Sequence, residues 1–206
     1  GWADVLPYFR KSESSERGAD ELHGGDGPLN TSTRRLPHPL TDAFVAAAGE
    51  VGIAPTDDFN GPQLEGAGYY DSTTKDGSRW SAARAYLTPV LGRPNLEVRT
   101  GVLVERVTFD GRRATGVRLR PGGEVRGREV ILSGGAINSP QLLMLSGVGP
   151  GAHLSRMGIE VVHDAPQVGR NLQDHLDVIL QWQCTQPITL NGNAAFTKKL
   201  GALWQW

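Results

Sequence analysis

The segment from Glu129 to Gly135 constrains the fold more than any other part of this sequence. Its first part, Glu129 to Ser133, is a short apolar run of the kind found in buried strands. We expect this strand to end at the adjacent glycines Gly134 and Gly135. Glycines at the carboxyl end of a buried strand let the backbone approach a ligand at the edge where open α/β sheets bind cofactors. Close packing between the strand and a following helix would explain the same pair equally well, and both alternatives stay open on spacing alone.

A helix is expected directly after this glycine turn. Asn138 and Ser139 precede Pro140, and a side chain that can cap a helix is common just before a proline in the first helical turn. The helix should then extend over Gln141 to Leu145. The order strand, glycine turn, helix is typical of α/β proteins, so we predict a mixed α/β or α+β fold.

The remaining segments are expected to alternate between helices and strands. Asp110-Gly111 and Gly122-Gly123 have the composition of tight turns, and the runs before and after the first pair alternate as strands do. Elsewhere, apolar residues recur at helical spacing, with Thr41 as a helix cap and Gly52 as a helix end. Helices are expected at residues 2–9, 41–51, 81–87 and 153–157, and strands at 96–99, 102–109, 114–119, 159–162 and 178–182.

Charge and composition exclude several classes of function. The chain has 206 residues and a formal net charge of -1, with acids and bases interspersed, so nucleic acid and anionic membranes are not expected as partners. A small-molecule substrate is expected instead. No apolar run reaches the ~18 residues that a transmembrane segment needs. Cys184 is the single cysteine, which excludes an intrachain disulfide and favours a reducing compartment, so we expect a cytoplasmic protein.

One stretch, Gly147 to Ala152, matches the spacing G-x-G-x-x-A and has Asp164 downstream at a distance suited to a ribose contact. A dinucleotide fingerprint must leave a strand and open a helix, so that backbone N–H groups meet the pyrophosphate. Here the expected helix precedes the glycines, and Pro150 removes an N–H where donors are needed. We therefore interpret the stretch as a glycine turn that ends a helix.

The histidines show no metal-binding pattern. They are scattered, without an H-x-x-x-H spacing and without paired cysteines, so no metal site is expected. His175 follows Asp174, but adjacent residues on a loop seldom form a catalytic pair. Ser146 lacks the G-x-S-x-G context of a nucleophile elbow.

The longest motif, Gly135 to Pro150 (GAINSPQLLMLSGVGP), resembles the second signature of the glucose-methanol-choline (GMC) oxidoreductases. Further segments resemble that family in the same order, so the similarity covers nearly the whole chain and is greatest to its choline and alcohol dehydrogenase branch. These segments are 2–13 (WADVLPYFRKSE), 26–29 (DGPL), 58–61 (DFNG), 77–87 (GSRWSAARAYL), 93–96 (RPNL) and 168–176 (VGRNLQDHL).

The resemblance implies FAD as cofactor, with part of a Rossmann-like FAD-binding domain and part of a substrate-binding domain. It implies that the Val104 backbone lies near the adenine and that Gly134 and Gly135 border the cofactor. It also implies that Asn171 and Asp174 lie in the loop that leads from the flavin domain toward the substrate domain. The implied division is 1–90 as a helix and loop region bridging the two domains, 91–175 as a partial FAD-binding domain, and 176–206 as the start of the substrate-binding domain.

The implied reaction is oxidation of a primary alcohol to an aldehyde, with hydride passing to flavin. The implied partners are therefore a small-molecule alcohol and an electron acceptor. Two alternatives stay open: a lyase on the same FAD scaffold, which needs no acceptor, and a non-catalytic binding module that folds without flavin. Family members carry their G-x-G-x-x-G strand before the first similar segment and their catalytic histidine after the last. No catalytic residue is therefore assigned, and we expect the chain alone to be inactive unless another chain supplies those segments.

Overall fold

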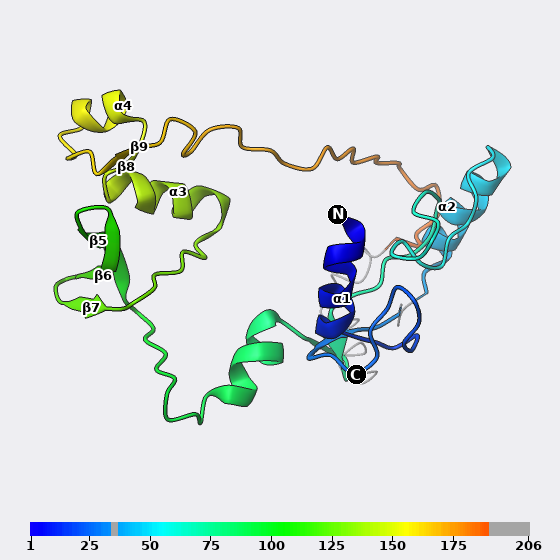
Figure 1. Cartoon of the computed structure of the whole chain (residues 1–206). Helices are drawn as coiled ribbons and strands as arrows, with labels where there is room; N and C mark the ends of the chain where they lie inside the picture. Colours follow the sequence, from blue (N-terminus) through cyan, green and yellow to red (C-terminus); the bar gives the residue numbers. More distant parts are fainter. Residues whose placement is uncertain (34–36, 190–206) are drawn as a thin grey trace. The chain divides into compact units, whose positions relative to one another are not determined.

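The computed structural model describes residues 1–33 and 37–189 and contains both helices and strands (Figure 1), which confirms the predicted mixed fold class. The chain divides into two compact units. The first unit comprises Gly1–Glu97 and the segment that begins at Gln181, and the second comprises Val98–Leu180. The functional roles predicted for 1–90, 91–175 and 176–206 stay predictions. Each unit is described by itself below.

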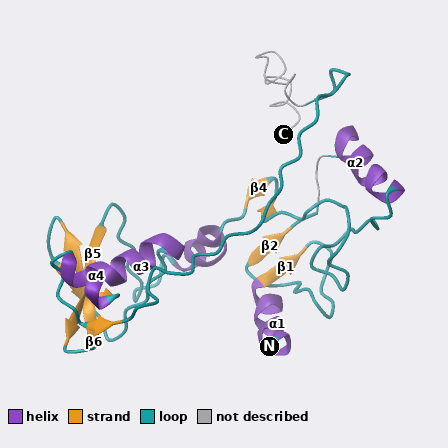
Figure 2. Ribbon diagram, turned by 90° about the horizontal axis from the view of Figure 1, so that it is seen from above, coloured by secondary structure: helices purple, strands orange, loops and turns teal. Residues whose placement is uncertain are grey.

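The first unit begins with helix α1 (Trp2–Ser12), which leads directly into strand β1 (Glu13–Ser15). Strand β2 (Leu29–Thr31) pairs with β1 in parallel, and Figure 2 shows the two strands side by side. The helix was predicted to end near Phe9, but it includes Pro7 and continues to Ser12. Pro7 lies inside α1, beyond its first turn, so the N–H that proline lacks removes one backbone hydrogen bond of the helix.

Helix α2 (Pro39–Glu50) begins earlier than predicted. The Nδ1 atom of His38 accepts a hydrogen bond from the Leu40 N–H at 3.2 Å, and Pro39 occupies the first turn, so His38 caps the helix in place of Thr41. Most of the apolar surface of α2 is exposed: Phe44 and Val51 are 52% and 76% exposed, and only Ala48 is buried.

The chain then forms a short antiparallel hairpin and two irregular helical turns. The hairpin consists of β3 (Thr74–Lys75) and β4 (Ser78–Arg79). A π-helical turn η1 (Ala83–Leu87) passes directly into the 3-10 turn η2 (Thr88–Val90). The helix predicted at 81–87 ends at Leu87 as expected, and Pro89 falls in the first turn of η2, where proline fits.

The second unit contains an antiparallel sheet in the order β5-β6-β7. Strands β5 (Leu103–Asp110) and β6 (Arg113–Arg120) confirm the predicted hairpin, and Gly111 has the positive φ of 56° that its turn requires. Strand β7 (Glu124–Arg126) follows the Gly122-Gly123 turn and was not predicted. The predicted strand at 96–99 is absent from the described part of the chain.

The strand and helix boundaries predicted around the glycine pair need correction. Residues 129–133 pair with no other strand of the described segments. Helix α3 (Gly135–Leu145) begins at the glycines themselves, so Pro140 lies inside it and not in the first turn. The Ser139 hydroxyl, expected to cap the helix, instead accepts a hydrogen bond from the Gly134 N–H at 2.9 Å.

Helix α3 is joined to the sheet through Ser146. The buried Ser146 hydroxyl accepts a hydrogen bond from the Val107 N–H of β5 at 2.8 Å and donates one to the Leu142 carbonyl at 2.5 Å. Since β5 is an edge strand of this sheet, its outer N–H groups are open to partners outside the sheet, such as the Ser146 hydroxyl. The end of α3 is thereby fixed against β5.

The second unit ends with strand β8 (Val148–Gly149), helix α4 (Gly151–Arg156) and strand β9 (His163–Asp164), with β8 and β9 paired in parallel. Leu154 of α4 is fully buried. The strand predicted at 159–162 is displaced, because pairing begins only at His163. Residues 178–182 form no ladder with the described chain, contrary to prediction. Within residues 1–33 and 37–189, no helix has the length and apolar character needed to cross a bilayer.

Candidate functional site

The two glycines at the start of α3 are exposed and differ in their surroundings. Gly135 has φ 85°, and a Cβ built on it meets no atom within 4 Å. A Cβ on Gly134 would lie 3.2 Å from the Asn138 Cβ and 3.3 Å from the Ser139 nitrogen. A side chain at Gly134 would therefore be tight against the start of α3, whereas Gly135 is favoured by its left-handed backbone conformation and faces open space.

Val104 lies on the second position of β5, half-buried, opposite Leu119 of β6. It immediately precedes the register shift toward Arg106. Such bulges redirect the chain and are enriched beside functional sites. The position is consistent with the expected backbone role of Val104, which stays a prediction.

Asn171 and Asp174 lie in an extended, exposed segment after β9. Asn171 has a positive φ of 55°, and its Nδ2 donates to the Gln167 Oε1 at 3.0 Å. The Asp174 Oδ1 accepts a hydrogen bond from the His175 backbone N–H at 2.8 Å. This contact uses the backbone of His175 and not its ring, which agrees with its interpretation as a loop histidine.

Helix α3 is the element to which several of these parts of the second unit are attached. Ser146 joins its end to β5, the strand that carries Val104. The chain just before Asn171 also approaches the helix, since a Cβ on Gly169 would lie 3.3 Å from the Met144 Cε and 3.9 Å from the Pro140 Cβ. Within residues 98–180, however, none of the predicted site residues forms a hydrogen bond with another of them.

The start of α3 fits a cofactor that approaches the backbone closely. Its first-turn N–H groups have no acceptor inside the helix, and Pro140 lies beyond that turn, so it removes none of these donors. The open space around Gly135 leaves them accessible. Among residues 1–33 and 37–189, no cluster of His, Cys, Asp or Glu is arranged to hold a metal ion.

The G-x-G-x-x-A stretch is excluded as a dinucleotide site by its contacts. The Asp164 Oδ1 accepts a hydrogen bond from the Gly151 N–H at 2.8 Å, so the acid that the spacing would place on a ribose caps α4. Gly147 has φ 86° and packs against the chain after α4, where its carbonyl accepts N–H groups of Val162 and His163 at 2.9 and 3.1 Å. The interpretation as a structural turn is supported.

Replacing Gly147 with alanine is expected to destabilise the chain by roughly 3 kcal/mol, because it combines a strained left-handed backbone with steric overlap. The new Cβ would lie 2.4 Å from the Glu160 carbonyl oxygen. Gly158→Ala is the matched control, since Gly158 has φ 71° but no atom within 4 Å of its Cβ position. Urea unfolding monitored by circular dichroism measures both variants. Equal losses for the two would contradict the packing role of Gly147.

A buried polar cluster in the first unit was not predicted. The ring of His23, which is 4% exposed, lies between two carboxylates: its Nδ1 is 3.1 Å from the Glu13 Oε2, and its Nε2 is 2.9 Å from the Asp58 Oδ2. These residues are far apart in sequence and carry no motif spacing. Burial lowers the pKa of His23, but hydrogen bonds and charge from Glu13 and Asp58 outweigh it, so the pKa lies above its ordinary value.

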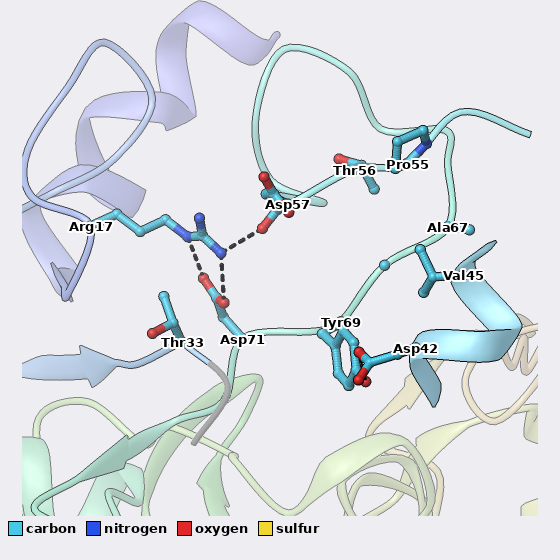
Figure 3. A pocket seen from close by; sticks show the side chains of 11 residues that line it. Arg17, Thr33, Asp42, Val45, Pro55, Thr56, Asp57, Ala67, Tyr69 and Asp71 are labelled. Atoms are coloured by element: carbon cyan, nitrogen blue, oxygen red, sulfur yellow. Dashed lines mark hydrogen bonds and ion pairs between the residues drawn. The ribbon is translucent and has the colours of Figure 1, made fainter. Parts of the chain in front are cut away.

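A second polar site lines a cavity of about 420 Å³ in the first unit (Figure 3). The Arg17 guanidinium forms a two-pronged ion pair with Asp71, at 2.9 and 3.0 Å, and also donates to the Asp57 carbonyl. The hydrogen bond to Asp71 raises the pKa of Arg17. Across the cavity, the Tyr69 hydroxyl donates to an Asp42 carboxylate oxygen at 2.7 Å. These pairs hold the walls together and do not resemble an acid–base arrangement.

Comparison with known proteins identifies the family. The sequence model of the GMC oxidoreductases matches residues 1–177, and the chain therefore belongs to that family. The mitochondrial choline dehydrogenase of Mus musculus is 52% identical over 214 residues, which cover 100% of this chain and 36% of that protein. The oxygen-dependent choline dehydrogenase of Brucella anthropi is 49% identical, with coverage of 99% and 38%. The chain thus spans little more than a third of the length of these relatives.

A solved structure shows the same fold. The FAD-dependent oxidoreductase from Chaetomium thermophilum superposes with a TM-score of 0.83 at 28% identity, over 99% of this chain and 39% of that one. Similarity over nearly the whole chain means that both compact units correspond to parts of that larger protein.

Proposed function

We propose that this chain is part of an FAD-dependent dehydrogenase or oxidase that converts a primary alcohol to an aldehyde by hydride transfer to the flavin. The observation that carries the proposal is the 52% identity to a choline dehydrogenase across 100% of the chain. The family assignment over residues 1–177 supports it independently.

In this proposal the start of α3 borders FAD with Gly134 and Gly135, and β5 contributes the Val104 backbone. Asn171 and Asp174 belong to the segment that leads away from the flavin. The positive φ of Gly135 and the open space around it support close backbone approach. When bound, FAD supplies a hydride acceptor that no amino-acid side chain can replace. These residues bind and orient, and no acid or base for the alcohol proton is assigned among them.

Choline, a primary alcohol that bears a quaternary ammonium group, is the substrate we propose first, because the choline dehydrogenases of mouse and Brucella anthropi are about half identical to this chain. Oxidation removes one hydride from the carbinol carbon and one proton from the hydroxyl, which leaves the aldehyde and reduced flavin. An electron acceptor, either oxygen or a quinone-like compound, then reoxidises the flavin.

Alcohol-dependent reduction of an artificial electron acceptor by the complete polypeptide that contains this chain tests the proposal. The kcat/KM for choline should be about tenfold higher than that for its neutral isostere 3,3-dimethylbutan-1-ol, because only choline offers a cation to the site. If other primary alcohols support reduction of the acceptor as well as choline does, the alcohol oxidoreductase activity would stand, but choline would be rejected as the preferred substrate. Absence of flavin reduction by every alcohol would favour the lyase or the binding module.

A further inference from the structure

The buried His23 joins three segments of the first unit that are distant in sequence. Glu13 stands at the junction of α1 and β1, His23 lies in the connection between β1 and β2, and Asp58 follows α2. The two contacts, at 3.1 and 2.9 Å, use both ring nitrogens. The His23 side chain is 5% exposed, so water cannot readily substitute for either carboxylate.

Simple proton counting fixes the charge state that this geometry requires. A neutral imidazole carries one N–H, and an ionised carboxylate carries none. With a carboxylate oxygen facing each ring nitrogen, a neutral His23 would direct a lone pair at one of them. Only the imidazolium donates to Glu13 and Asp58 at once. In the neutral form one buried carboxylate oxygen would face a ring nitrogen without a hydrogen bond, and such an unpaired buried polar group is costly.

Neither carboxylate is free to turn away from the ring. The Glu13 Oε2 also accepts the Gly24 N–H at 3.1 Å, while its Oε1 accepts from the Thr31 hydroxyl at 3.0 Å. The Asp58 Oδ1 accepts the Asn60 N–H at 2.8 Å. Rotation of either carboxylate would therefore break hydrogen bonds to β2, to the loop around Gly24 or to the turn after Asp58.

We propose that His23 is a protonation-dependent latch, in which one imidazolium ties the Asp58 segment to the α1–β1 junction and its deprotonation releases that segment. The latch borders an apolar cavity of about 720 Å³ in the same unit. Asn60, Gly61 and Leu64, just beyond Asp58, form one wall of this cavity. Release of the Asp58 segment therefore loosens that wall.

The other charges near the latch favour the protonated state. Asp20, in the same connection as His23, accepts the His23 backbone N–H at 2.6 Å, and the hydrogen bonds from His23 and Leu22 lower the pKa of Asp20. The positive charge of Arg17 near Asp58 opposes protonation of His23. The Arg17 guanidinium is, however, already engaged by Asp71. Glu13 and Asp58 thus face the ring with two carboxylates, while Asp20 contacts the backbone of His23.

The direction of the pH dependence follows from the pKa of His23, which is raised by folding. The stabilisation is complete below the ordinary histidine pKa of 6.5 and is lost as pH rises through the higher pKa of the folded state. The latch is therefore closed below the ordinary histidine pKa and opens as pH rises through the raised pKa of folded His23.

NMR titration of the uniformly 15N-labelled 206-residue chain tests the latch. Below its titration midpoint His23 should show both ring nitrogens protonated, and this midpoint should lie above that of the same residue in the urea-unfolded chain. The backbone amides of Asn60 and Gly61 should shift with the same midpoint, and this response should disappear in His23→Gln. A His23 midpoint in the folded chain at or below its midpoint in the urea-unfolded chain would overturn the proposal without any variant.

Substitutions of the partners provide the second arm. Glu13→Gln and Asp58→Asn should each lower the His23 midpoint, whereas Glu21→Gln, an exposed acid in the same connection, should leave it unchanged. Equal midpoints in all three variants would overturn the role of the two carboxylates. If the chemical shifts of the Asn60 and Gly61 amides do not change as His23 titrates, the proposed release of the Asp58 segment is wrong.

Discussion

Gly24→Ala is expected to destabilise the first unit by at least ~3 kcal/mol, because the added methyl group has no space. A Cβ at this position would lie 1.8 Å from the Arg10 carbonyl oxygen and 2.6 Å from that of Glu13. Both atoms belong to the backbone at the end of α1, so no side-chain rotation can relieve the overlap. The Gly24 backbone is also fixed on both sides, since its carbonyl accepts the Ser15 N–H at 2.8 Å and its N–H donates to Glu13.

Gly49→Ala provides the matched control for this measurement. Gly49 lies inside α2, and a Cβ there meets no atom within 4 Å. Alanine should therefore be neutral or stabilise the helix by up to ~1 kcal/mol. Thermal unfolding monitored by far-ultraviolet circular dichroism compares the two variants with the unmodified chain. A Gly24→Ala transition as high as that of Gly49→Ala would show that the loop can move away from α1.

Local patterns were sufficient for elements whose partners lie nearby in sequence. The β5–β6 hairpin was predicted because alternation on each side of Asp110-Gly111 and a turn with positive φ specify it locally. The segment 129–133 has an equally strong strand composition, yet it pairs with no strand of the described chain. Strand pairing depends on a neighbouring edge, and composition alone does not reveal whether that edge is present.

Helix boundaries were harder to predict, because each cap depends on a single contact. Asn138-Ser139-Pro140 was predicted to begin a helix, but the left-handed Gly135 allows α3 to start several residues earlier. His38 in turn replaces Thr41 as the cap of α2 through a ring nitrogen, an acceptor that capping preferences rank low.

The sequence identified the family's glycine pair but not the buried histidine. Gly134 and Gly135 stand next to each other after an apolar run, so the pattern is visible in one short window. His23, Glu13 and Asp58 come from three segments joined only by folding, and a lone histidine has no distinguishing spacing. The only available signal was that Glu13 and Asp58 lie in family-like segments, at 2–13 and 58–61.

Large apolar side chains are exposed along the extended segment after Asn171. Leu176 is 98% exposed, and Val178 and Trp182 are 71% and 70% exposed. Apolar surfaces of this kind are commonly contact sites. Their exposure agrees with a chain that spans 36% of its mouse relative, in which further residues are available to cover them.

The visible spectrum of the purified 206-residue chain, recorded after incubation with FAD and removal of free cofactor, tests most directly whether this chain carries only part of a flavin site. A flavin site of this type takes its main pyrophosphate donors from a helix that follows a G-x-G-x-x-G strand. The comparable spacing at Gly147 leads into the short helix α4, which Asp164 already caps.

We therefore predict no stoichiometric flavin band and no alcohol-dependent dye reduction by the chain alone, while the complete polypeptide should show both. The start of α3 and the β5 strand would then border a cofactor that is anchored elsewhere. A stoichiometric, protein-bound flavin band with turnover in the 206-residue chain would contradict this account, because the pyrophosphate donors would then have to come from residues present here.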